Sequence, residues 1–82
     1  MVIAKYDSIF EQKMRKIKNA ADKEKVKKQI GKILENPDVG KPMRYSRKGA
    51  REVYVPSFRL SYIYYQQENS VLFLDIYHKD KQ

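Results

Sequence analysis

Two stretches near the C-terminus decide the fold: residues 58–67, FRLSYIYYQQ, and residues 70–78, SVLFLDIYH. Both are rich in aromatic and β-branched side chains, the composition typical of β-strands. Only Glu68 and Asn69 separate them, and such a short polar connection predicts a tight turn. We therefore expect the two stretches to pair as an antiparallel hairpin.

The segment before this hairpin predicts a third strand. Residues 51–55 alternate, with Val53 and Val55 on one face, and the Pro-Ser pair at 56–57 predicts the turn into the next strand. Residues 37–50, PDVGKPMRYSRKGA, contain two prolines and two glycines and show no helical period. They predict a loop that could include a short strand, followed by an antiparallel meander.

The N-terminal half has the spacing of two amphipathic helices. Ser8 stands three residues before Glu11, as in a capping box, and Asp22 is the expected cap of the second helix. Pro37 should end that helix near Asn36. Apolar residues recur at helical spacing in two sets: Ile9, Phe10, Met14 and Ile17, then Val26, Ile30, Ile33 and Leu34.

Residues 2–6, VIAKY, predict a short strand ahead of the helices. The element order is then β-α-α-β-β-β, an α+β class. Neither layer can hide its apolar surface alone. We expect a two-layer fold in which the N-terminal strand and helical hairpin pack on a largely antiparallel sheet of about four strands. A chain of 82 residues forms one domain, residues 1–82.

The composition excludes several classes of site. There is no cysteine and a single histidine, so neither disulfides nor a convincing zinc site are expected, and no cofactor motif is present. The N-terminus lacks an apolar signal region, and no stretch approaches the roughly 18–20 apolar residues of a membrane span. These features predict a soluble, cytoplasmic protein without membrane contact.

The net charge of +8 suits a polyanion partner, although a basic host proteome or simple solubility would also produce it. Lysines in the helical segments alternate with acidic residues, as on solvated helix faces. Residues 41–51 differ because they contain five cations and no acid. Two tyrosines lie in or beside this segment and could stack on unpaired bases. The predicted RNA-binding residues are Lys41, Arg44, Tyr45, Arg47, Lys48 and Tyr54.

Residues 58–62, FRLSY, resemble the aromatic-Arg-apolar-x-Tyr strand of the RelE/ParE toxin superfamily. The polar turn and the apolar strand ending in YHKD, residues 77–80, are similar to that family's terminal strand. Together with the two helices and the basic loop, the resemblance covers essentially the whole chain. It implies a RelE-like domain with the fold expected above.

The resemblance also implies a function. Many RelE-type members are mRNA interferases, which cut mRNA in the ribosomal A site and so inhibit translation, whereas ParE-type members poison DNA gyrase. We therefore expect the toxin of a toxin–antitoxin pair, a ribosome-dependent and metal-independent endoribonuclease. The alternative is a gyrase-directed toxin, or a member that binds only its antitoxin or RNA. The implied partner is an acidic antitoxin that folds on binding, which complements the basic chain.

Four residues are candidates for the chemistry. Arg59 matches the family's strand arginine at the scissile phosphate, and its planar fork suits phosphate oxygens. Lys79, with His78 beside it, falls near the family's basic residue after the last strand. His78 is the one side chain whose ordinary pKa lies near neutrality, and Arg51 is a second phosphate-binding candidate.

Alternatives remain open for these residues. His78 could be a surface residue, and Arg59 could instead pair with Asp75 across neighbouring strands. Glu52 and Tyr54 lie in the strand where ribonuclease members of the family have basic side chains. This difference favours the alternative without ribonuclease activity, a gyrase-directed toxin or a member that binds only its antitoxin or RNA.

Overall fold

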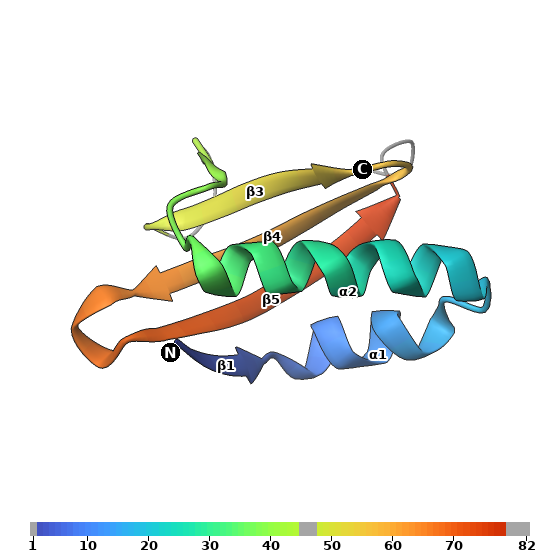
Figure 1. Cartoon of the computed structure of the whole chain (residues 1–82), viewed down its shortest axis with the longest axis horizontal. Helices are drawn as coiled ribbons and strands as arrows, with labels where there is room; N and C mark the ends of the chain where they lie inside the picture. Colours follow the sequence, from blue (N-terminus) through green and yellow to red (C-terminus); the bar gives the residue numbers. More distant parts are fainter. Residues whose placement is uncertain (1, 45–47, 79–82) are drawn as a thin grey trace.

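The computed structural model describes residues 2–44 and 48–78 and arranges them in two layers (Figure 1). In those ranges the elements follow the order of the chain. They are β1 (Ile3–Tyr6), α1 (Ser8–Lys16), α2 (Ala20–Glu35), β2 (Lys41–Pro42), β3 (Ala50–Val55), β4 (Phe58–Tyr65), the 3-10 turn η1 (Gln66–Glu68) and β5 (Ser70–His78).

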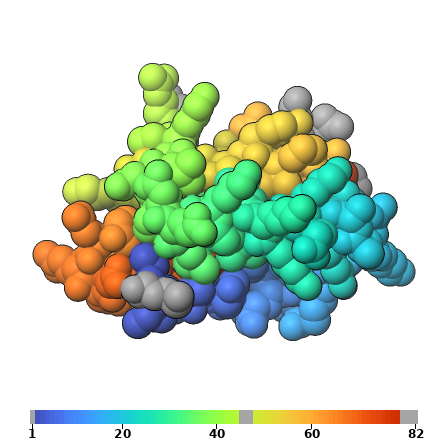
Figure 2. Space-filling view, in the orientation of Figure 1, coloured from blue at the N-terminus to red at the C-terminus, as the bar shows by residue number. Residues whose placement is uncertain are grey.

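The strands form one mixed sheet in the order β1-β5-β4-β3-β2. β1 runs parallel to β5, and the other neighbours are antiparallel. Both helices lie on one face of the sheet and cover it in the space-filling view (Figures 1 and 2). The α+β two-layer fold is thus confirmed. The sheet has five strands where about four were expected, because the short β2 joins its edge.

β5 contains one residue more than its pairing with β4 requires. Ser61 pairs with Asp75 while Tyr62 pairs with Phe73, so Leu74 has no partner residue in β4. Such a β-bulge shifts the alternation of side chains on the bulged strand. Phe73 and Ile76 consequently both reach the core, although three positions separate them.

Both helices begin earlier than the sequence predicted. Asp7 caps α1, and its carboxylate accepts the backbone N–H two residues later at 3.0 Å. Ser8 is already helical, so the predicted capping box is wrong. The side-chain oxygen of Asn19 caps α2 by accepting the amides of Ala21 and Asp22 at 2.8 and 3.2 Å. Asp22 therefore lies in the first turn of the helix, where its charge still favours the helix dipole.

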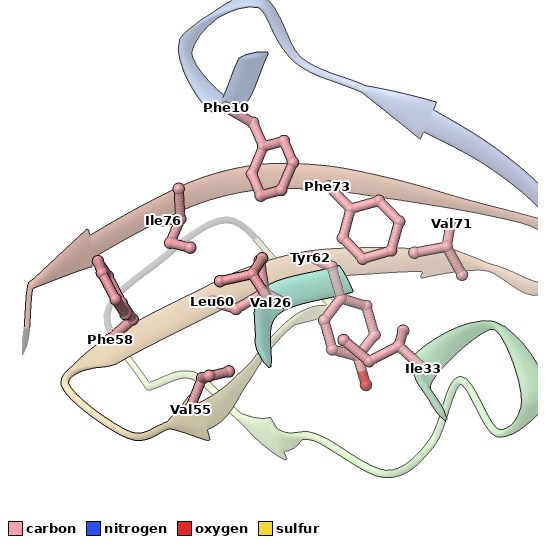
Figure 3. Packing of buried hydrophobic residues seen from close by; sticks show 10 residues of the cluster. All are labelled: Phe10, Val26, Ile33, Val55, Phe58, Leu60, Tyr62, Val71, Phe73 and Ile76. Carbon is pink, nitrogen blue, oxygen red and sulfur yellow. The ribbon is translucent and has the colours of Figure 1, made fainter. Parts of the chain in front are cut away.

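The core lies between the helices and the sheet (Figure 3). Alternate residues of β4 point into it and meet apolar residues of both helices, which confirms the two-layer packing. Ile9 is the exception among the predicted helix residues, because 51% of it is exposed. The buried cluster comprises Phe10, Val26, Ile33, Val55, Phe58, Leu60, Tyr62, Val71, Phe73 and Ile76.

Tyr62 connects this core to the loop after α2. Its buried hydroxyl accepts the backbone N–H of Gly40 at 2.9 Å and donates to the carbonyl of Pro37 at 2.7 Å. A Cβ atom at Gly40 would lie 2.7 Å from the Tyr62 hydroxyl, so only glycine fits there. At Gly31 of α2, in contrast, a Cβ atom would meet nothing within 4 Å.

These two glycines make a matched test of the packing. Gly40→Ala should lower the free energy of unfolding by about 1–3 kcal/mol, because the added methyl displaces the Tyr62 hydroxyl. Gly31→Ala should raise it by about 0.5–1 kcal/mol, because alanine is the better helix former. Urea unfolding of both variants measures the two effects. Equal stability of Gly40→Ala and the wild type would contradict the proposed role of the loop contact.

Candidate functional site

The face of the sheet opposite the helices carries a cluster of polar side chains on three adjacent strands. Side chains alternate along a strand, so the residues between the core positions point to this uncovered face. Arg59 of β4 lies directly opposite Tyr54 of β3 and Tyr77 of β5. Glu52 lies on β3, diagonal to Arg59. We call Glu52, Arg59 and Tyr77 the sheet-face triad.

The carboxylate of Glu52 accepts hydrogen bonds from both other members of the triad. The Nη1 atom of Arg59 donates to Oε1 of Glu52 at 2.7 Å, and the Tyr77 hydroxyl donates to Oε2 at 2.6 Å. Both distances are typical of charge-assisted hydrogen bonds. The alternative pairing of Arg59 with Asp75 is wrong, because Asp75 accepts from Nζ of Lys13 at 2.7 Å.

The surroundings hold Tyr77 in its neutral form. Burial and the hydrogen bond to the Glu52 carboxylate raise the pKa of Tyr77 from 10.0 to about 12, although the charge of Arg59 opposes this. Near neutrality the phenol therefore keeps its proton and can donate it. The Nε atom of Arg59 is buried and has no hydrogen-bond partner among the residues described.

Two neighbouring hollows, of about 500 and 400 Å³, open above the triad. Lys41, Glu52 and Arg59 line both of them. Tyr54 lines the larger hollow and Arg44 the smaller one. The structure therefore brings three predicted RNA-binding residues, Lys41, Arg44 and Tyr54, to the same face as Arg59. Lys48 is exposed, and Tyr45 and Arg47 lie outside the described residues.

Arg51 lies on the other side of the sheet. It pairs with Tyr62, and its Nη1 atom donates to the carbonyls of Gly40 and Asp38 at 2.7 and 3.2 Å. Its Nη2 atom lies 3.6 Å from a carboxylate oxygen of Asp38. Arg51 therefore holds the loop after α2, and the structure does not bring it to Arg59.

His78 also turns away from Arg59. Its exposed ring lies against Phe58, a core residue on the helix-covered side, with ring centroids 4.6 Å apart. There it lines a cleft of about 530 Å³ together with Lys16 and Lys18, near the start of α2. Lys79 lies outside the described residues. Tyr77, which sequence analysis missed, occupies the place beside Arg59.

Uninterrupted alternation along residues 70–78 would place His78 on the same face as Ser70 and Arg59. The bulge at Leu74 reverses this beyond residue 74, and no feature of the sequence marks it. Tyr77 and His78 therefore exchange faces. The phenol of Tyr77, and not the imidazole of His78, lies beside Arg59.

The described parts of the chain offer no obvious metal site. Within residues 2–44 and 48–78, no group of three or more His, Asp or Glu side chains could hold a metal ion. In the same ranges, no helix is both long and apolar enough to cross a membrane.

The raised pKa of Tyr77 predicts a dependence of stability on pH. The folded chain holds this proton more tightly than the unfolded chain, so Tyr77 stabilises the fold fully below pH 10 and loses that effect as the pH rises towards 12. The difference in unfolding free energy between wild type and Tyr77→Phe should shrink across this window. Urea unfolding from about pH 9 to 12 measures it. Tyr64→Phe is the control, and a difference that stays constant with pH would contradict the assignment.

Comparisons with known proteins identify the family and the fold of this chain. The family model described as ParE toxin of type II toxin-antitoxin system, parDE, matches residues 4–82. No match is found among curated protein sequences.

Several solved structures share the fold. The isolated E. coli RelE toxin is 15% identical with a TM-score of 0.84, covering 100% of this chain and 88% of that one. A chain of the intact E. coli RelBE toxin–antitoxin complex is 18% identical with a TM-score of 0.80, over 93% and 94% of the two chains. A chain of the RelBE2 complex from Mycobacterium tuberculosis is 20% identical with a TM-score of 0.80, over 95% and 98%. Because the family model spans nearly the whole sequence, this chain belongs to the ParE toxin family of type II toxin–antitoxin systems, within the RelE/ParE superfamily.

Proposed function

We propose that this toxin is a metal-independent endoribonuclease that cuts mRNA on the ribosome and so inhibits translation. The observation that carries the proposal is the position of Arg59, which lies on the uncovered sheet face below two hollows also lined by cations. A guanidinium is suited to a phosphate, because its fork matches two phosphate oxygens, and the Arg59 side chain is 35% exposed.

The same face offers contacts for a single strand of RNA. Lys41 and Arg44 flank the triad and supply attraction to the phosphate backbone. Tyr54 is 56% exposed and presents an aromatic surface to a base beside Arg59. Both hollows are small and shallow for a folded RNA, so an extended strand fits this face best.

The proposal includes the ribosome because in-line attack requires a fixed RNA backbone. The described residues beside Arg59 are suited to contact a phosphate and a base. A ribosome holds the codon in a fixed conformation and would supply that orientation. The fold shared with the isolated E. coli RelE toxin supports a toxin role.

The proposed partner is an acidic antitoxin that folds on binding. The chain has a net charge of +8, and such a partner would neutralise it. Two of the similar solved chains come from RelBE toxin–antitoxin complexes, which supports a partner of this kind.

A second candidate function is that of a gyrase-directed toxin without ribonuclease activity. Glu52 favours it, because this carboxylate partly neutralises the arginine that would bind the phosphate. His78, the one histidine of the chain, lies against Phe58 on the other side of the sheet, so the imidazole does not stand beside Arg59.

Primer extension on mRNA from an in vitro translation reaction tests the choice. The purified chain should produce new cuts within ribosome-occupied codons, and Arg59→Ala should reduce cleavage by about 100-fold or more, because the phosphorane loses its positive partner. Arg15→Ala removes an exposed arginine from α1 and should cut like the wild type. Circular dichroism checks that both variants fold.

Intact mRNA and undisturbed translation would contradict the ribonuclease proposal. Trapped gyrase–DNA cleavage complexes in a supercoiling assay would then select the second candidate.

A further inference from the structure

We propose that Glu52 accepts the proton of the attacking 2′-hydroxyl and that Tyr77 donates a proton to the leaving 5′-oxygen. This inference rests on the ribonuclease function proposed above and assigns two roles within the same site. It reverses the expectation that Glu52 marks a site unfit for catalysis.

The reaction requires two proton transfers and one site for negative charge. The 2′-oxygen loses its proton and forms a bond to phosphorus, and the bond between phosphorus and the 5′-oxygen breaks. The leaving 5′-oxygen takes up a proton. The products are a 2′,3′-cyclic phosphate and a 5′-hydroxyl, so no water, metal ion or oxidant is consumed. Arg59 would neutralise the phosphorane between these steps.

Glu52 is the one acidic side chain among the described residues that line the two hollows. A carboxylate is an acceptor only, which suits the role of general base. Glu52 would also lie beside a phosphate bound by Arg59, because its Oε1 atom lies 2.7 Å from Nη1 of Arg59. A 2′-hydroxyl next to a phosphate bound by Arg59 would therefore lie within reach of this carboxylate.

The ion pair between Glu52 and Arg59 changes during such a reaction. In the resting site Glu52 holds part of the charge of Arg59, with side chains 20% and 35% exposed. When Glu52 takes the proton, it becomes neutral and its attraction to the guanidinium falls. The attraction between Arg59 and the phosphorane then strengthens, because negative charge develops on the phosphorane while Glu52 no longer competes for the guanidinium. An interaction that strengthens in the transition state speeds the reaction more than one present throughout.

Tyr77 is suited to the opposite transfer. With a pKa of about 12 it remains protonated at neutral pH. It is nevertheless far more acidic than an alcohol, so proton transfer to a leaving alkoxide is favourable.

The contact between Glu52 and Tyr77 closes the cycle. After cleavage Glu52 carries an extra proton and Tyr77 lacks one. The hydrogen bond of 2.6 Å between them provides a direct path for that proton to return. The triad is then in its starting state, and no proton has been gained or lost.

The test uses ribosome-bound mRNA cut by the wild type at a mapped position, and a matched mRNA in which sulfur replaces the leaving 5′-oxygen there. A thiolate leaves without protonation, so this substrate removes the need for a general acid. On normal mRNA, Glu52→Gln and Tyr77→Phe should each cleave about 10²–10⁴-fold more slowly than the wild type. On the sulfur-substituted mRNA, Tyr77→Phe should return to within about tenfold of the wild type, whereas Glu52→Gln should remain slow.

Matched controls separate these roles from loss of structure. Glu68→Gln removes a carboxylate that pairs with Lys5 at 3.5 Å, and Tyr64→Phe removes a hydroxyl on the helix-covered face. Both should cleave each substrate like the wild type. Glu52→Asp keeps a carboxylate and should recover part of the rate lost in Glu52→Gln. A purely structural role of Tyr77 would leave its variant equally slow on both substrates.

The outcomes are distinguishable. Wild-type rates for Glu52→Gln, or no recovery of Tyr77→Phe on the sulfur-substituted mRNA, would overturn the two roles while leaving the ribonuclease function standing. A wild-type chain that cuts no ribosome-bound mRNA would reject the ribonuclease function, and the roles with it. A 2′,3′-cyclic phosphate on the upstream fragment, seen by mass spectrometry, supports attack by the 2′-oxygen.

Discussion

The structure depends on the alternation of side chains along β4. This strand lies between β5 and β3, and its pairing on both sides fixes its register. Phe58, Leu60 and Tyr62 are almost entirely buried beneath the helices, which forces Arg59 to the opposite face. A slip of one residue would place a guanidinium in the core and aromatic rings in water. The hydrophobic effect thus positions the arginine, although the arginine takes no part in the core.

The elements that sequence patterns predicted well are those determined by local periodicity. The strand at 70–78 has the predicted bounds, and the helical stripes containing Phe10, Val26 and Ile33 are buried. The caps were misplaced because Asp7 and Asn19 compete for the same role with Ser8 and Asp22 a few residues away. Each pair offers similar side chains, and only the backbone conformation decides between them.

The candidate site was harder to predict because its contacts join distant parts of the chain. Arg59 was expected from the resemblance of residues 58–62 to the strand of RelE/ParE toxins. Arg51 has its partners in the loop after α2, away from Arg59, and the alternation of its own strand does not reveal these contacts. The choice between Tyr77 and His78 required knowledge of one unpaired residue in β5. The alternation of side chains predicts which face of the sheet each residue occupies. It does not predict where a bulge interrupts that alternation.

The bulge at Leu74 has a consequence for how homologous chains are aligned. Because the pairing beyond it remains in step with β4, a relative whose terminal strand runs without a bulge needs one residue fewer to place the same side chain opposite the arginine. A gap therefore belongs at Leu74 in any such alignment. Without it, every role transferred past this point falls one position early, on Ile76 instead of Tyr77. At identities of 15–20%, the spatial pairing of strands is a safer guide to equivalent residues than the count along the chain.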